Sequence, residues 1–191
     1  MNKTILYFHG FKSSSDSTKA QNLKKFIKKN TKNTLIKVPN LNDNFENAFN
    51  EINKIIESCD NDIIFMGSSL GGYYATYFSQ IHNTKAVLIN PAIAPLKGFD
   101  VNLGENENYA TGNKFIINKG DITFLRSLSF KKLSNLENIM VLVESDDEIL
   151  PFNKTSSYFS GSHIDVTFGG DHSYQSLSSK YIKIKNFLNL A

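Results

Sequence analysis

Short apolar runs alternate with longer amphipathic stretches along most of the chain, and this alternation restricts the possible folds more than any other feature. The apolar runs cover residues 4–8, 34–38, 63–66, 86–89, 139–143 and 164–168. Each run is rich in β-branched or aromatic residues and is short enough for a strand that is buried on both faces. Strands that alternate with helices pair in parallel through right-handed crossovers. We therefore predict an α/β fold, a three-layer α/β/α sandwich around a mainly parallel sheet of about six strands.

Four stretches between or after these runs have the hydrophobic spacing of helices. They cover residues 19–29, 44–57, 70–81 and 174–190. Asp16, just before the first of them, is a candidate N-cap. Residues 92–137 are longer than one crossover needs, and we expect them to form a modest insertion that flanks the active site. Ligands of such sheets bind beyond the carboxyl ends of the strands, so the chemistry is expected there.

The composition is that of an ordinary globular chain, and we expect residues 1–191 to form a single domain. The formal net charge is only +3, which argues against nucleic-acid binding because phosphate neutralisation needs a dense basic face. The single cysteine, Cys59, excludes an internal disulfide framework and a multi-cysteine metal site. No apolar run approaches about 18 residues, and no signal region opens the chain. We therefore expect a soluble, cytoplasmic protein without a membrane partner.

The clearest chemical signal is Gly67-Ser68-Ser69-Leu70-Gly71, which reads as G-x-S-x-G between an apolar run and a helical stretch. A nucleophile on such a sharp turn has a strained backbone, and glycines two residues to either side keep the turn free of clashes. The turn also aims the helix N-terminus at a developing oxyanion, so the Leu70 amide becomes a donor to it. Ser69 is the candidate nucleophile, and the side chain of Ser68 is expected to face elsewhere.

A serine nucleophile needs a base, which in turn needs an orienting acid. In folds with this turn the acid and then the histidine follow the serine along the chain. Of the four histidines, His9 comes too early, His82 lies near the end of a surface helix, and His163 opens the last strand at its amino end. His172 follows that strand within Gly169-Gly170-Asp171-His172, at the carboxyl edge of the sheet. His172 is therefore the candidate base.

The acid is expected in the loop after residues 139–143, where Glu144-Ser145-Asp146-Asp147-Glu148 has four acidic side chains in five residues. One of them should reach the imidazole, while most of the others are expected to be solvated. Spacing does not separate Asp146 from Asp147, because a strand end is uncertain by about two residues. The residues alone leave this choice open.

The first apolar run ends in Phe8-His9-Gly10-Phe11. A glycine at this point permits a turn of the backbone, and the amide of Phe11 can then point into the site. The Phe11 amide is therefore the candidate second oxyanion donor, beside that of Leu70.

These stretches resemble the YqiA-type small bacterial esterases of the α/β-hydrolase superfamily, over nearly the whole chain. The resemblance is carried by 6–14 (LYFHGFKSS), 66–76 (MGSSLGGYYAT), 169–172 (GGDH), Lys19-Ala20, Asn90-Pro91-Ala92, 103–108 (LGENEN), Thr111-Gly112 and Asp147-Glu148 with Leu150. There are two departures from the pattern of the group. Asp146 replaces the glycine that usually precedes the acid, and Tyr109 stands where the group tends to have proline.

The resemblance implies a catalytic triad of Ser69 as nucleophile, Asp147 as acid and His172 as base. The backbone N–H groups of Phe11 and Leu70 would form the oxyanion hole. The activity implied is hydrolysis of carboxylic esters or of acyl-CoA thioesters, with a small-molecule substrate and with neither a metal nor an organic cofactor. We expect a compact α/β-hydrolase fold with strand order 2-1-3-4-5-6.

Two alternatives remain open at this stage. An acyltransferase or a peptidase would use the same triad. A binding protein could keep the fold without the chemistry, because a fold does not fix a function. The oligomeric state is open as well.

Overall fold

The computed structural model describes residues 2–191 and contains a six-stranded, fully parallel sheet in the order β2-β1-β3-β4-β7-β8. The strands are β1 (Lys3–Phe8), β2 (Thr34–Lys37), β3 (Asp62–Ser68), β4 (Ala86–Ile89), β7 (Ile139–Glu144) and β8 (His163–Thr167). Counted along the chain within this sheet, the order is 2-1-3-4-5-6. The α/β/α sandwich and its strand order are therefore confirmed.

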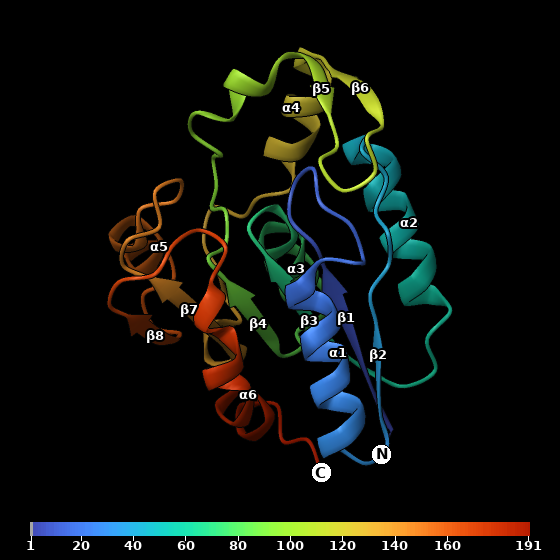
Figure 1. The fold of residues 1–191 in the computed structure, drawn as a ribbon, viewed down its shortest axis with the longest axis vertical. Helices are drawn as coiled ribbons and strands as arrows, with labels where there is room; N and C mark the ends of the chain where they lie inside the picture. The colour runs from blue at the N-terminus through green and yellow to red at the C-terminus, as the bar shows by residue number, and fades with distance from the viewer. Residues whose placement is uncertain (1) are drawn as a thin grey trace.

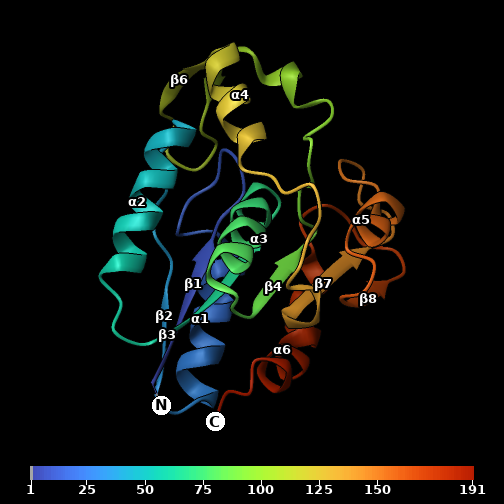
Figure 2. The same ribbon diagram turned by 180° about the vertical axis from the view of Figure 1, so that it is seen from behind.

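Helices cover both faces of this sheet (Figures 1 and 2). They are α1 (Thr18–Asn30), α2 (Phe45–Glu57), α3 (Leu70–His82), α4 (Lys119–Ser127), α5 (Phe152–Tyr158) and α6 (Tyr181–Phe187), with the 3₁₀ turns η1 (Phe99–Asn102), η2 (Leu136–Asn138) and η3 (Gln175–Lys180). Figure 1 shows α1 and α6 in front of the sheet, and Figure 2 shows α2 and α3 on the opposite face. Within residues 2–191, no helix is both long enough and apolar enough to cross a membrane.

Strand β1 shows why its sequence is almost continuously apolar. Successive side chains of a strand point to opposite faces of the sheet. Ile5 and Tyr7 pack into the core beneath α1 and α6, whereas Leu6 and Phe8 pack into the core beneath α2 and α3. Both faces of the strand are therefore buried, so its residues do not alternate between apolar and polar.

Helix α2 forms as its sequence pattern predicts. Its buried side chains, Phe45, Ala48, Ile52 and Ile56, fall on one face at helical spacing. Asn44 caps the helix, because its side chain accepts a hydrogen bond from the backbone N–H of Asn47 at 3.0 Å.

Two expectations about helix boundaries were wrong. Asp16 is not an N-cap: α1 begins one residue later than that role requires, with Ser17 at the capping position. The stretch 174–190 is not one helix but the 3₁₀ turn η3 followed by α6. Tyr174, whose φ of 52° is left-handed, cannot belong to a right-handed helix and stands before η3.

The last strand also lies one residue earlier than expected. It covers His163–Thr167, and the ring of Phe168 is exposed to solvent rather than part of the sheet. His163 is nevertheless at the amino end of this strand, as predicted.

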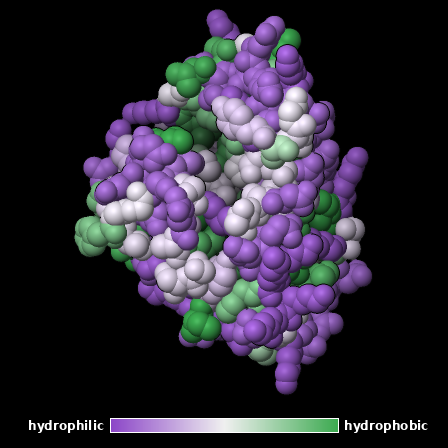
Figure 3. Space-filling view, in the orientation of Figure 1, coloured by the Kyte–Doolittle hydropathy of each residue, from purple (hydrophilic) through white to green (hydrophobic). Residues whose placement is uncertain are grey.

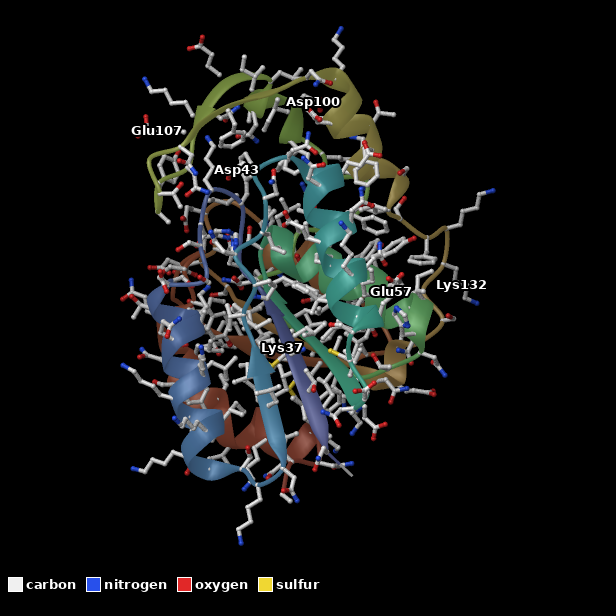
Figure 4. All side chains as sticks on the ribbon, turned by 90° about the vertical axis from the view of Figure 1, so that its right-hand side faces the viewer. Lys37, Asp43, Glu57, Asp100, Glu107 and Lys132 are labelled. Atoms are coloured by element: carbon white, nitrogen blue, oxygen red, sulfur yellow. The ribbon has the colours of Figure 1, made fainter. Side chains whose placement is uncertain are left out.

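Residues 92–137 contain η1, α4 and a separate antiparallel hairpin of β5 (Gly104–Glu107) and β6 (Lys114–Ile117). The hairpin lies beyond the carboxyl ends of the main strands, at the top of Figure 1. Asn108 anchors it by donating from Nδ2 to Asp43 Oδ1 at 2.7 Å, and Figure 4 shows Asp43 beneath the hairpin. The ring of Phe115 packs edge-on against Phe11, 6.0 Å away. The insertion therefore covers the loop that follows β1.

We predict that the chain unfolds as one domain. The two apolar cores lie on opposite faces of the same sheet, and the insertion adds Ile117, Ile122 and Leu125 to one of them. Urea unfolding should therefore give one transition, with the same midpoint by far-UV circular dichroism and by tyrosine fluorescence. Two separate transitions would divide the insertion from the rest of the chain and contradict this prediction.

Candidate active site

Ser69 stands at the sharp turn between β3 and α3, with φ of 53° and ψ of −122°. This region is strained for any residue except glycine, at a cost of about 1–3 kcal/mol. Backbone hydrogen bonds hold the strained turn. The N–H of Ser69 donates to Ile89 O at 3.1 Å, and its carbonyl accepts from Gly72 N at 2.9 Å and Ala92 N at 3.0 Å.

The glycines on either side of the turn are required by close backbone contacts. A Cβ on Gly67 would lie 2.2 Å from the carbonyl oxygen of Gly71, and one on Gly71 would lie 2.1 Å from that of Phe8. No larger residue fits at either position. The N-terminus of α3 therefore packs directly against the carboxyl ends of β1 and β3.

The structure brings Ser69, His172 and Asp147 together in a hydrogen-bonded chain. His172 Nε2 lies 3.0 Å from Ser69 Oγ, and His172 Nδ1 lies 2.9 Å from Asp147 Oδ2. A carboxylate only accepts hydrogen bonds, so in the neutral imidazole Nδ1 carries the proton and donates it to Asp147. Nε2 is then the acceptor that faces the hydroxyl of Ser69.

Asp147, and not Asp146, meets the imidazole. The side chain of Asp147 is 1% exposed, and its Oδ1 also accepts from the backbone N–H groups of Ile149 at 2.9 Å and Leu150 at 2.8 Å. Asp146 is exposed and accepts instead from the hydroxyl of Ser145 at 2.7 Å. A tight turn after the strand thus aims one carboxylate inward and its neighbour outward.

Two neighbours of the Ser69–His172–Asp147 chain were not expected to be structured. Glu144 is 1% exposed, and its Oε2 accepts from the N–H of Asp171 at 2.9 Å. Glu148 Oε2 accepts from the N–H of His172 at 3.0 Å. Of the acids that do not reach the imidazole, Asp146 and Glu148 are exposed as expected, whereas Glu144 is buried and not solvated. The carboxylates of Glu144 and Glu148 take up the backbone donors of the loop that carries His172, which has little apolar packing of its own.

Asn90, at the end of β4, is a further member of the site that sequence reasoning missed. Its Nδ2 donates to the carbonyls of Asp171 at 3.0 Å and His172 at 3.3 Å, and its Oδ1 accepts from Glu144 N at 2.9 Å. The available signal was its place directly after a buried strand, on the edge where ligands bind. The backbone of His172 is thus held at its N–H and at its carbonyl.

The two candidate oxyanion donors lie beside Ser69. A Cβ on Gly10 would be 3.3 Å from the Cβ of Ser69, which places the His9-Gly10-Phe11 turn against the serine. Among the described residues, neither the N–H of Phe11 nor that of Leu70 has a hydrogen-bond acceptor. The two donors therefore remain available to a ligand. Figure 3 shows a hollow on this edge, between the segments that follow β1 and β4.

The other histidines have separate structural contacts. His9 Nδ1 lies 2.9 Å from Gly10 O, and its Nε2 accepts from Leu41 N at 3.0 Å. Burial lowers the pKa of His9 and so favours its neutral imidazole, whose two ring nitrogens hold the loop after β1. His82 stacks against Phe78, and His163 packs edge-on against Phe187.

Two other features complete the description of the site. Ser68 faces away from Ser69, because its Oγ accepts a hydrogen bond from Tyr7 at 3.3 Å. In the described part of the chain, no group of three or more His, Cys, Asp or Glu side chains is arranged to hold a metal ion.

A parallel sheet with a strained serine between its third strand and the following helix defines the class: this is a compact α/β-hydrolase fold. Residues 4–189 match the model of the uncharacterised protein family UPF0227, and the chain belongs to that family.

Known proteins match this chain over nearly its full length. A UPF0227 protein from Pectobacterium carotovorum is 23% identical over 190 residues, which cover 97% of this chain and 99% of the relative. The mouse alpha/beta hydrolase domain-containing protein 10 superposes with a TM-score of 0.75 at 16% identity, over 97% of this chain and 89% of that one. Est1E from Butyrivibrio proteoclasticus, with ferulic acid bound, has a TM-score of 0.73 at 13% identity, over 98% and 88%. These structures support the fold assignment.

Lys19, on the first turn of α1, adds a positive charge to the acidic side of the site. Burial lowers the pKa of Lys19 to about 8, and the negative charges of Glu144, Asp171 and Asp147 offset part of this effect. Below pH 8 the amine is charged in both the folded and the unfolded chain, and its burial costs stability. Between pH 8 and its ordinary value of 10.5 only the unfolded chain keeps the proton, so stability rises with pH.

We predict that Lys19→Met raises the free energy of unfolding at pH 7. The advantage over the wild type should shrink as the pH rises from 8 towards 10, because the wild-type amine then loses its charge. Urea unfolding at several pH values measures both effects. Lys24→Met is the matched control, since Lys24 lies exposed on the same helix. A Lys19→Met protein that is less stable at pH 7 would mean that attraction to the three carboxylates outweighs burial.

Proposed function

We propose that this protein is a serine hydrolase that cleaves carboxylic esters through an acyl-enzyme. The single observation that carries the proposal is the chain of contacts Ser69 Oγ–His172 Nε2–Nδ1–Asp147 at the carboxyl edge of the sheet. The loops after three separate strands, β3, β7 and β8, contribute to this geometry, which a merely structural histidine would not need. The esterase and hydrolase names among the structural neighbours favour the same reading.

The first half of the reaction forms the acyl-enzyme. Ser69 Oγ attacks the acyl carbon while His172 Nε2 takes the hydroxyl proton, and Asp147 stabilises the imidazolium that results. The carbonyl oxygen becomes an oxyanion that accepts hydrogen bonds from the free N–H groups of Phe11 and Leu70. When the tetrahedral intermediate collapses, the alcohol leaves with the proton from His172.

The second half releases the acid. His172 takes a proton from water, the hydroxide attacks the acyl carbon of the acyl-enzyme, and the same oxyanion donors stabilise the intermediate. Collapse frees the carboxylic acid and returns the proton to Ser69. An acyl-CoA thioester would follow the same route with a thiol as the leaving group. The residues of the chain supply every proton-transfer step.

We predict that Ser69→Ala abolishes both ester hydrolysis and covalent labelling by a fluorophosphonate probe. Hydrolysis should fall by about 10⁴-fold or more, because the covalent route is lost. Ser68→Ala is the matched control and should keep most of the activity, since its hydroxyl faces Tyr7. Circular dichroism checks that both variants fold. If Ser68→Ala were the inactive variant, the nucleophile would be misassigned.

We also predict that Asp147→Asn lowers kcat by about 10⁴-fold, because an amide at this position favours the wrong tautomer of His172. Asp146→Asn should stay within a few-fold of the wild type, since this carboxylate is exposed and points away from the imidazole. Steady-state hydrolysis of one short-chain ester by both variants measures the difference. An active Asp147→Asn protein beside an inactive Asp146→Asn protein would move the role by one position.

The alternatives from the sequence have direct tests as well. A non-catalytic binding protein would not react with the fluorophosphonate. An acyltransferase would label, but would give a new ester or amide rather than the free acid when an alcohol or amine is supplied. A peptidase would cleave amide substrates with the same residues.

A further inference from the structure

A groove of about 790 Å³ lies between the segment after β4 and helix α5. Most of its lining is apolar, with Ile93, Leu96, Phe99 and Leu150 among its members, and its charged members are Lys97 and Lys154. No Asp or Glu is among the described residues that line it. Apolar concavities of this size bind the hydrocarbon parts of small molecules.

Two contacts place the groove against the candidate triad. Ala92, on its lining, donates its N–H to the carbonyl of Ser69 at 3.0 Å. Leu150, also on the lining, donates its N–H to Asp147 Oδ1 at 2.8 Å. Two residues that line the groove are therefore hydrogen-bonded directly to Ser69 and Asp147, which do not line it themselves.

A third contact connects the groove to the oxyanion loop. The ring of Phe99, another lining residue, lies 5.3 Å from the ring of Phe11, measured between centroids. When the carbonyl oxygen of a ligand faces the N–H of Phe11, the rest of the ligand can therefore extend into the groove.

The position of His172 separates the acyl group from the leaving group. In the proposed reaction His172 must reach the leaving-group oxygen to protonate it, so the leaving group lies on the His172 side of Ser69. In the described chain, no residue of 169–174 lines the groove. The part of the substrate that points away from His172 is the acyl chain, so it can enter a groove that no residue of the His172 loop lines.

We propose that this groove binds the acyl chain, so that the substrates are esters of aliphatic acids longer than acetate. This inference rests on the proposed ester hydrolysis and adds its substrate class. Each methylene that moves from water into the apolar groove should raise kcat/KM by up to about fourfold, until the groove is filled.

Two substrate series test the assignment with the wild-type protein. The first keeps p-nitrophenol as the leaving group and lengthens the acid from acetate to octanoate. The second keeps acetate and lengthens an aliphatic alcohol from ethanol to octanol, followed by acid release. We expect kcat/KM to rise steeply along the acid series and to change little along the alcohol series.

A matched pair of variants then tests the groove itself. Ile149 lines the groove and is 59% exposed, so Ile149→Trp adds bulk there with little disturbance of the core. The ratio of kcat/KM for the octanoate ester to kcat/KM for the acetate ester should fall at least tenfold in this variant. Ile116→Trp is the control, because Ile116 is 70% exposed on β6 and does not line this groove. It should keep the wild-type ratio.

A variant that widens the groove gives an independent measurement. Tyr158→Ala removes a lining ring and should move the preferred acid to a longer chain. It also keeps the test decisive if Ile149→Trp fails to fold.

The outcomes are distinguishable. An octanoate-to-acetate ratio that Ile149→Trp and Tyr158→Ala both leave unchanged would overturn the groove assignment. A rise along the alcohol series that Ile149→Trp removes would put the leaving group in the groove and overturn the acyl assignment. A wild-type protein that neither hydrolyses esters nor labels with fluorophosphonate would defeat the proposed function itself, and with it this inference.

Discussion

The left-handed backbone of Ser69 is the constraint on which the rest of the carboxyl edge depends. Its strain of about 1–3 kcal/mol is stable only because surrounding contacts determine the turn completely. Gly67 and Gly71 leave room for α3 to start against the end of β1, and the carbonyl of Ser69 is held from two directions. The same turn sends the serine hydroxyl towards His172 and leaves the N–H of Leu70 free. One local conformation therefore places both the proposed nucleophile and a proposed oxyanion donor.

The loop that carries His172 is fixed by polar contacts where apolar packing is scarce. Glu148 and Asn90 hold the backbone of His172 from both sides, and Glu144 holds the preceding residue. Hydrogen bonds to charged groups contribute about 1.5–3 kcal/mol each, enough to order a short loop. Burying Glu144 brings a desolvation cost, which its donors and the nearby charge of Lys19 offset. The imidazole is thus positioned through its backbone as well as through Asp147.

The sequence predicts those features whose causes are local. Alternating buried strands and amphipathic helices predict the parallel sheet and its layers, and the glycines around Ser69 predict the turn, because each signal lies within a few residues. The strand order was expected from the resemblance to the α/β-hydrolase fold. The acid is different: the choice of Asp147 over Asp146 follows from backbone donors at Ile149 and Leu150, and no periodicity encodes that turn. The role of Asn90 depends on contacts with residues more than 50 positions away. The resemblance to the esterase group favours Asp147, but it assigns Asn90 no role.

The backbone that positions the candidate triad also forms the wall of the groove. Ala92 supports the carbonyl of Ser69, and Leu150 supports the carboxylate of Asp147, while both residues line the groove. In each case the supporting contact is a backbone N–H, which any residue except proline supplies. The side chains can therefore differ in size without removing the hydrogen bonds that hold the nucleophile and the acid. Under the proposed function, the depth of the groove could therefore vary with the acid that it accepts while the geometry of Ser69, His172 and Asp147 stays fixed.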